Sequence, residues 1–429
     1  TSLAKAGTGL TDSSLTAGKL TTTGAVYDYA KPTYVATALD FGNVRAGTTL
    51  AGQSIAINNL VVTDAAYQEA LAVSASSANA KLALGSLAGL TAGNAAGTIT
   101  VDASAATAGS LAGNISLGFT SLAKAGTNLG NTVLAGGTVA VTGAVYDYAK
   151  PTVVNSLAFG NVRVGAANNV AVANTTVTNA AFQDGLNVVA SSSNGNLTVV
   201  SPAKIVAGQS GNVGVTATAV GDLAATITLN LTSNANGIAG LTDQALTAKT
   251  VAVTGTAYEY AAAGLSSKTI AFGQLHVGAT AVSDTVAVTN TLVAAGYQDN
   301  LSVTATAVSG VTTSAISELA AGGSANLTFT ADTSVARSLA GAVTLGLTST
   351  STVSGLDAKS LSSAATIATT GLVYSGQSVW ATNGNGSWGT FASGFGANWG
   401  ANQGSAGLDA AFADVDTATF DNTGLTAGA

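Results

Sequence analysis

The chain has 429 residues and a formal net charge of −7, and only 8% of its residues are charged, which argues against a nucleic-acid-binding surface. It contains one histidine and no cysteine, so disulfide scaffolds, thiolate metal sites and cysteine nucleophiles are excluded. No apolar run approaches the roughly 20 residues that a membrane-spanning helix needs. Because the chain lacks an initiator methionine, we expect a processed product or a fragment.

Residues 1–32 form the first predicted element, an orphan terminal strand. The string TSLAKAGT occurs at Thr1 and again at Thr120, and residues 1–31 match residues 120–150, which form the end of a module. Two explanations stay open for this strand. It is cut from a longer repeat array, or its residues 17–30 add to a sheet of a neighbouring subunit as a donated strand.

Three copies of one module follow, predicted at 33–150, 151–262 and 263–375. The copies share an FGNV-like strand and a Tyr-Gln-acid block, and the aligned phenylalanines Phe41, Phe159 and Phe272 are 118 and 113 residues apart. We expect these phenylalanines to hold equivalent buried positions. Prolines in the short linkers favour a semi-rigid rod of modules.

Within each module the apolar residues alternate with small polar ones, a period of two that indicates strands. About seven short strands in roughly 110 residues predict an antiparallel immunoglobulin-like sandwich. A β-helix would repeat every 20 to 30 residues, which disagrees with the observed spacing. The fold class is therefore all-β, with tandem immunoglobulin-like β-sandwich repeats and no helix longer than two turns.

Residues 376–429 form a separate element, a β tail rich in Trp, Gly and Asn. All three tryptophans lie there, at positions 380, 388 and 399. The order of Trp380, a Gly/Asn turn, Trp388 and Asn398-Trp399, followed by the strand that ends at Phe420, is similar to the opening of autotransporter-associated repeats of bacterial surface proteins.

The modules carry a second resemblance. The FGNV strand is followed about ten residues later by VAVxN, at 170–174 and 286–290, and this pattern resembles the choice-of-anchor-D sandwich repeats, which are related to Hydin-like immunoglobulin-like modules. Both resemblances imply a secreted or outer-surface bacterial protein, and neither implies catalysis.

The candidate sites all have a simpler structural explanation. His276 occupies the register position of Arg45 and Arg163, and we interpret it as a solvated residue at a strand end, since neither a second histidine for zinc nor a strained serine elbow is present. The Tyr-acid-Tyr strands suggest sugar recognition, but alternation favours core anchors with outward-facing acids, at Tyr27/Tyr29 with Asp28, Tyr146/Tyr148 with Asp147, and Tyr258/Tyr260 with Glu259.

The densest acidic cluster lies in the tail. Carboxylates there could hold Ca²⁺, but the spacing of Asp409, Asp414, Asp416 and Asp421 lacks the pattern of a calcium loop. We therefore expect no catalytic, cofactor-binding or metal-binding residue, no cofactor, and no enzyme activity. Asn-x-Ser/Thr sequons are present, and in a chain this rich in Asn and Thr they assign no compartment.

These observations predict a non-catalytic structural subunit of an extracellular bacterial filament or surface assembly. Its weakly charged sheets would polymerise through their edges or by strand addition, so the expected partner is another copy of the chain. The expected location is extracellular or on the outer cell surface. The alternative is the stalk of a secreted adhesin or autotransporter-like binding protein.

Overall fold

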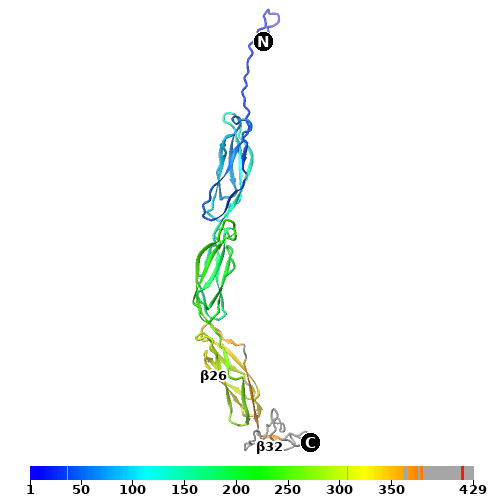
Figure 1. Ribbon diagram of the computed structural model, residues 1–429. Coiled ribbons are helices and arrows are strands. Elements are labelled where there is room, and N and C mark those ends of the chain that lie inside the picture. Colours follow the sequence, from blue (N-terminus) through cyan, green and yellow to red (C-terminus); the bar gives the residue numbers. More distant parts are fainter. Residues whose placement is uncertain (36, 307, 362–364, 375–376, 380–416, 420–429) are drawn as a thin grey trace, which may run out of the picture.

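The computed structural model describes residues 1–429 except 36, 307, 362–364, 375–376, 380–416 and 420–429. Three β-sandwiches follow one another end to end and form a rod (Figure 1). Apart from strands, the described residues contain two single 3₁₀ turns, η1 Ala65–Tyr67 and η2 Ala180–Phe182. The prediction of an all-β chain of tandem immunoglobulin-like sandwiches is confirmed.

The first sandwich packs a four-stranded sheet against a larger one. The smaller sheet has the order β1-β3-β7-β5, with β1 Pro32–Tyr34, β3 Gln53–Asn59, β7 Gly97–Ala103 and β5 Leu82–Leu84. The larger sheet has the order β2-β10-β9-β4-β6, with β2 Leu39–Arg45, β10 Thr132–Tyr146, β9 Gly113–Leu122, β4 Ala70–Ser77 and β6 Leu87–Leu90, and β8 Gly109–Ser110 pairs with β10.

The second sandwich repeats this topology. One sheet has the order β11-β13-β16-β15, with β11 Pro151–Val153, β13 Ala167–Asn174, β16 Ser210–Ala217 and β15 Leu197–Val200. The other has the order β12-β19-β18-β14, with β12 Ser156–Arg163, β19 Gln244–Tyr258, β18 Ala225–Asn234 and β14 Gly185–Ser192, and β17 Gly221–Asp222 pairs with β19.

The third sandwich has the same plan. Its smaller sheet has the order β20-β22-β26-β24, with β20 Ala263–Leu265, β22 Ser283–Asn290, β26 Ser324–Ala331 and β24 Val311–Thr313. Its larger sheet has the order β21-β30-β28-β23-β25, with β21 Thr269–His276, β30 Ala365–Tyr374, β28 Gly341–Thr350, β23 Asn300–Ala305 and β25 Ile316–Leu319, and it also includes β27 Arg337–Ser338 and β29 Lys359–Ser360.

One strand pair in each sandwich is parallel, which corrects the expectation of purely antiparallel strands. The FGNV-like strand β2 lies parallel to the closing strand β10, and β12 with β19 and β21 with β30 repeat the arrangement. In the first sandwich the pair places Arg45 opposite Tyr146. Both strands of each pair therefore end at the same end of the sandwich, and in the first two sandwiches the next sandwich begins there.

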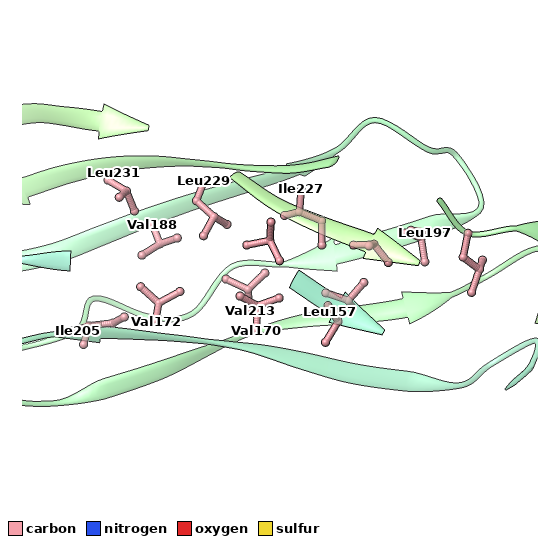
Figure 2. Close-up of a cluster of buried hydrophobic side chains, with 14 of the residues drawn as sticks. Leu157, Val170, Val172, Val188, Leu197, Ile205, Val213, Ile227, Leu229 and Leu231 are labelled. Atoms are coloured by element: carbon pink, nitrogen blue, oxygen red, sulfur yellow. The ribbon is translucent and has the colours of Figure 1, made fainter. Parts of the chain in front are cut away.

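The inward-facing apolar residues fill three separate cores. Figure 2 shows the second core, where Val170 and Val172 of one sheet face Val188 and Leu229 of the other. Phe41 and Phe272 are buried as expected, but Phe159 is only half-buried at the margin of its core. Alternation along the strands places these side chains between the sheets.

A glycine marks the irregularity in each parallel pair, and Gly255 illustrates why. It has φ of +147°, and a Cβ built on it would lie 2.7 Å from the carbonyl oxygen of Gly160. We predict that Gly255→Ala destabilises the second sandwich by at least about 1–3 kcal/mol, the cost of the backbone strain, to which the contact with Gly160 adds. Urea unfolding measures the loss. Gly195 is the matched control, because nothing lies within 4 Å of its would-be Cβ. Equal effects of the two alanines would contradict this account.

Two short segments complete the description. β31 Gln377–Val379 lies parallel to β32 Thr417–Thr419 beyond the third sandwich. At the other end, residues 1–26 extend away from the first sandwich (Figure 1), with internal hydrogen bonds between Ser2 and Ser13. The tryptophans and the four tail aspartates at 409, 414, 416 and 421 lie outside the described residues.

Candidate functional site at the junctions between sandwiches

A buried ion pair joins the first sandwich to the second. β2 ends at Arg45, and the guanidinium Nη1 lies 2.8 Å from Oδ1 of Asp184, just before β14. The side chain of Arg45 is 14% exposed and that of Asp184 is fully buried. A second guanidinium nitrogen donates to the carbonyl oxygen of Thr242 at 3.0 Å. One side chain of the first sandwich is thus held at two points of the second.

The same contact recurs at the next junction. Nη2 of Arg163, at the end of β12, lies 2.6 Å from Oδ2 of Asp299. The amide side chains two residues earlier also cross each junction: Asn43 donates to the carbonyl of Ala239 at 3.1 Å, and Asn161 to that of Ser354 at 3.0 Å. Arg45 and Arg163 are therefore not solvated strand-end residues, and that interpretation of their register position is wrong for both.

The tyrosines of the Tyr-acid-Tyr segments surround these ion pairs. The guanidinium carbon of Arg45 lies 4.4 Å from the ring centroid of Tyr148, and that of Arg163 lies 4.5 Å from the ring of Tyr260. Such cation–π contacts add to the attraction. The first tyrosine of each segment contacts an aromatic ring of the following sandwich, with centroids 5.6 Å apart for Tyr146 and Phe182.

The interpretation of the tyrosines as core anchors is therefore wrong. Tyr146 and Tyr258 are half-buried, Tyr29 and Tyr148 are exposed, and none belongs to a core cluster. Strand alternation stops being a guide here, because the strand leaves its own sandwich and runs along the next one. The acid between the tyrosines is not always outward-facing either, since Asp147 is buried.

The residues that follow the closing strands β10 and β19, 147–150 and 259–262, form tethers fixed to the next sandwich. The amide of Asp147 donates to the carbonyl of Phe182 at 2.9 Å, and the amide of Asp184 donates back to the carbonyl of Asp147 at 3.0 Å. Glu259 makes the same pair of bonds with Tyr297 and Asp299. Each tether therefore holds the end of the preceding sandwich next to the buried carboxylate, Asp184 or Asp299, of the following one.

A serine hydroxyl links each carboxylate to the tether. Ser233 donates to Oδ2 of Asp184 at 2.7 Å and accepts from the amide of Ala149 at 2.8 Å. Ser349 makes equivalent bonds with Asp299 and Ala261, at 2.7 and 3.0 Å. Hydrogen bonds to the charged form are what allow a carboxylate to remain buried beside one arginine.

A buried asparagine completes the face. Asn174 is fully buried, and its Oδ1 accepts from the tether amide of Lys150 and from Nε2 of Gln183, both at 3.0 Å. Its Nδ2 donates to the carbonyls of Asp184 and Ile205. Asn59 and Asn290 make the corresponding bonds in the other sandwiches. The VAVxN and Tyr-Gln-acid blocks of the repeat thus form one network.

The first sandwich has the same face without an arginine. Glu69 is 2% exposed, and Ser121 donates to its Oε2 at 2.5 Å while accepting from the amide of Ala30 at 2.7 Å. The amide of Asp28 donates to Tyr67, and Glu69 donates back to Asp28, so residues 28–31 form the tether. Within the described part of the chain, no lysine or arginine lies within ion-pair distance of Glu69.

The other predicted positions lie apart from this network. His276 is half-buried at the end of β21, in the register position of Arg45. Across the ranges described above, no three His, Cys, Asp or Glu side chains gather where they could hold a metal ion. None of the described helical turns has the length or apolar character to cross a membrane.

Two carboxyls outside the junctions have shifted pKa values. The amide of Gly42 and the hydroxyl of Thr142 donate to Asp40 and lower the pKa of its carboxyl. Hydrogen bonds from Ser334 lower the pKa of Asp332, which also faces Arg337. Since both shifts are downward, any stabilisation they give is present above the unfolded pKa near 3.9 and is lost as the pH falls through the lower folded value.

No protein-family model matches the chain, and no curated protein matches it in sequence. Among solved structures, an I-band fragment of titin is similar at 7% identity and a TM-score of 0.24, covering 80% of this chain and 99% of that one. Extracellular cadherin domains 1–5 of protocadherin gamma B2 match at 10% identity and 0.30, covering 84% and 61%. Domains 4–9 of the surface-layer protein SbsC match at 15% identity and 0.21, covering 80% and 48%.

Proposed function

We propose that this chain is a non-catalytic structural rod, a subunit of an extracellular bacterial filament or surface assembly. The observation that carries the proposal is the clamp at each junction, in which a largely buried arginine, a fully buried aspartate and a hydrogen-bonded tether hold consecutive sandwiches. A chain of independent binding domains needs no such clamp, because domains joined by linkers move relative to one another by default. A rod that transmits force or sets a fixed length does need a clamp, because its sandwiches must keep one relative orientation.

The proposal keeps the modular division predicted from the repeats. An orphan segment at 1–32 precedes modules at 33–150, 151–262 and 263–375, and a tail follows at 376–429. The support for this division is that both clamps include a Tyr-acid-Tyr segment, at 146–148 and 258–260, which is the segment that ends each proposed module. The modules would then be equivalent spacers.

Assembly is proposed to use strand addition through the N-terminal segment. The edges of the smaller sheets are weaker candidates, because their outer strands β1, β5, β11 and β15 have only three or four residues each, and short edges discourage pairing. The larger sheet of the second sandwich ends in longer strands, β12 and β14 with eight residues each, so edge pairing there is the second candidate. Residues 13–26 have a strand-type sequence, yet after Ser13 their backbone groups make no hydrogen bond to another described residue. Unpaired strand backbone is satisfied by adding to a sheet of another chain.

Deleting residues 1–26 tests this function. We expect the full chain to form filaments in electron micrographs and the shortened chain to remain as single rods. Folding should be unchanged, because no hydrogen bond within the described residues joins 1–26 to a sandwich. The deletion must stop there, since Asp28, Ala30 and Lys31 are bonded to the first sandwich.

The melting temperature is the control for this deletion, and it should not change. Filaments of unchanged width from the shortened chain would contradict strand addition. Single rods from both chains would instead favour the adhesin stalk, in which the clamped sandwiches hold a binding tip away from the cell.

A further inference from the structure

The N-terminal end of the first sandwich is built like the two junction faces but lacks their central ligand. At both junctions a buried carboxylate, bonded to a serine that also binds the tether, pairs with an arginine of the preceding sandwich. On the first sandwich, Glu69, Ser121 and the tether residues Asp28 and Ala30 repeat every part except the arginine. Burying a carboxylate without a cation is costly, so a site of this kind is one that a cation completes.

A second feature of the same end points to the same partner. Residues 20–27 repeat residues 139–146 of β10, the strand that closes the first sandwich. Val145 is fully buried in β10, whereas its counterpart Val26 is 90% exposed, and Leu20 is 89% exposed where Val139 is buried. This segment therefore has the sequence of a closing strand but pairs with no sheet among the described residues.

The register of the parallel pair connects the two features. In the first sandwich β2 lies beside β10 with Arg45 opposite Tyr146, and Arg45 then reaches the carboxylate of the next sandwich. A strand lying in the same way beside residues 20–27 would place its last residue opposite Tyr27. An arginine there would reach Glu69 and lie over the ring of Tyr29, as Arg45 lies over Tyr148.

We propose that residues 20–29 and Glu69 together form a receptor for an immunoglobulin-like sandwich that lacks its closing strand. The partner presents an arginine at the end of the strand that pairs with residues 20–27. Each of the three described sandwiches is closed by its own strand, β10, β19 or β30, so a described sandwich of a second copy could take up residues 20–27 only with its own closing strand displaced. The inference rests on the proposed use of the N-terminal strand in assembly, and it specifies what that strand recognises.

The test supplies such a partner from the chain's own sequence. Residues 32–119 are fused ahead of Thr1 of the full chain, so that residues 1–27 follow Phe119 as residues 120–146 do in the first sandwich. We expect backbone amides of residues 20–27 to exchange with solvent at least about a hundredfold more slowly in the fused chain than in the original one. Unchanged exchange would overturn the proposal.

The arginine is tested by a double-mutant cycle in the fused chain. Arg45→Ala is made in the added segment, and Glu69→Gln is made in the original first sandwich. Each should lower the unfolding midpoint, and the double variant should be no worse than the more damaging single one. Additive effects would overturn the assignment of Glu69 as the receptor for the arginine. Neither measurement requires filaments, so failure here is distinct from failure of the proposed structural role.

Val26→Asp is the matched variant for the strand. In the original chain Val26 is exposed, so the change should leave the melting temperature as it was. In the fused chain the same residue would be buried, so the slow exchange of residues 20–27 should be lost. A silent Val26→Asp in the fused chain would also overturn the proposal.

Discussion

Arg163→Ala is expected to destabilise the third sandwich by about 3–5 kcal/mol, because it leaves Asp299 buried without its cation. The side chain of Asp299 is 1% exposed, and its remaining partner is the hydroxyl of Ser349. The substitution also removes one of two cations that contact the ring of Tyr260. The other, Nζ of Lys359, lies 4.3 Å from the ring centroid and remains. Calorimetric unfolding should show the loss in the transition of the third sandwich.

Arg337→Ala is the matched control, because it also removes an arginine from an ion pair. Asp332 lies 3.4 Å away and is 40% exposed, so this pair should contribute about 0–1 kcal/mol. Adding Asp299→Asn to Arg163→Ala should recover part of the lost stability, since a buried amide costs less than an unpaired carboxylate. Equal losses from the two arginine variants would contradict the clamp.

The sandwich fold was predictable from the sequence because its signals are local. The alternation of apolar and small polar residues along segments such as Val170 to Asn174 identifies strands, and the repeat counts the sandwiches. The parallel pairing of β2 with β10 was not predictable in this way. It depends on which strands meet at a sheet edge, and the alternation of side chains is the same in both orientations.

The junctions were misread for a related reason. Arg45, Arg163 and the tyrosines were assigned by the rules of a single sandwich, in which a strand end is solvated and alternate residues face the core. Their actual contacts are with the following sandwich, which begins at the same end. A signal for this was present, since Asn174, Gln183 and Asp184 recur together in all three copies as buried-type positions filled by polar residues.

The clamp places four charged side chains, two arginines and two aspartates, at the junctions. Among the described residues, the two ion pairs with a buried carboxylate both lie between sandwiches, and the core clusters contain apolar residues. A buried pair is weak evidence for stability, because apolar residues of similar size often stabilise as well. Its advantage at a junction is geometric, since a planar guanidinium held by a carboxylate and a carbonyl permits one orientation of the two sandwiches.

Asn174→Leu is expected to be about as damaging as loss of the arginine, although it changes no charge. The side chain is fully buried and satisfies the amide of Lys150, one N–H of Gln183, and the carbonyl of Asp184. The carbonyl of Ile205 keeps a second donor, the amide of Leu186. Two buried groups and the partly buried amide of Lys150 therefore lose their only partner for that bond. At about 1–3 kcal/mol for each group, and less for the partly buried one, this predicts a loss of about 3–6 kcal/mol in urea unfolding.

Asn169→Leu on the same strand is the matched control, because Asn169 is exposed and should tolerate the change within about 0.5 kcal/mol. Asn174→Asp separates hydrogen bonding from shape, since it keeps the size of the side chain and loses the Nδ2 donor. Because Oδ1 of the aspartate still accepts from Lys150 and Gln183, Asn174→Asp should keep the tether in place, and the amide of Lys150 should exchange faster in the leucine variant only. An Asn174→Leu protein as stable as the Asn169→Leu control would show that the tether and the buried face are held by packing, and the clamp would then consist of the arginine alone.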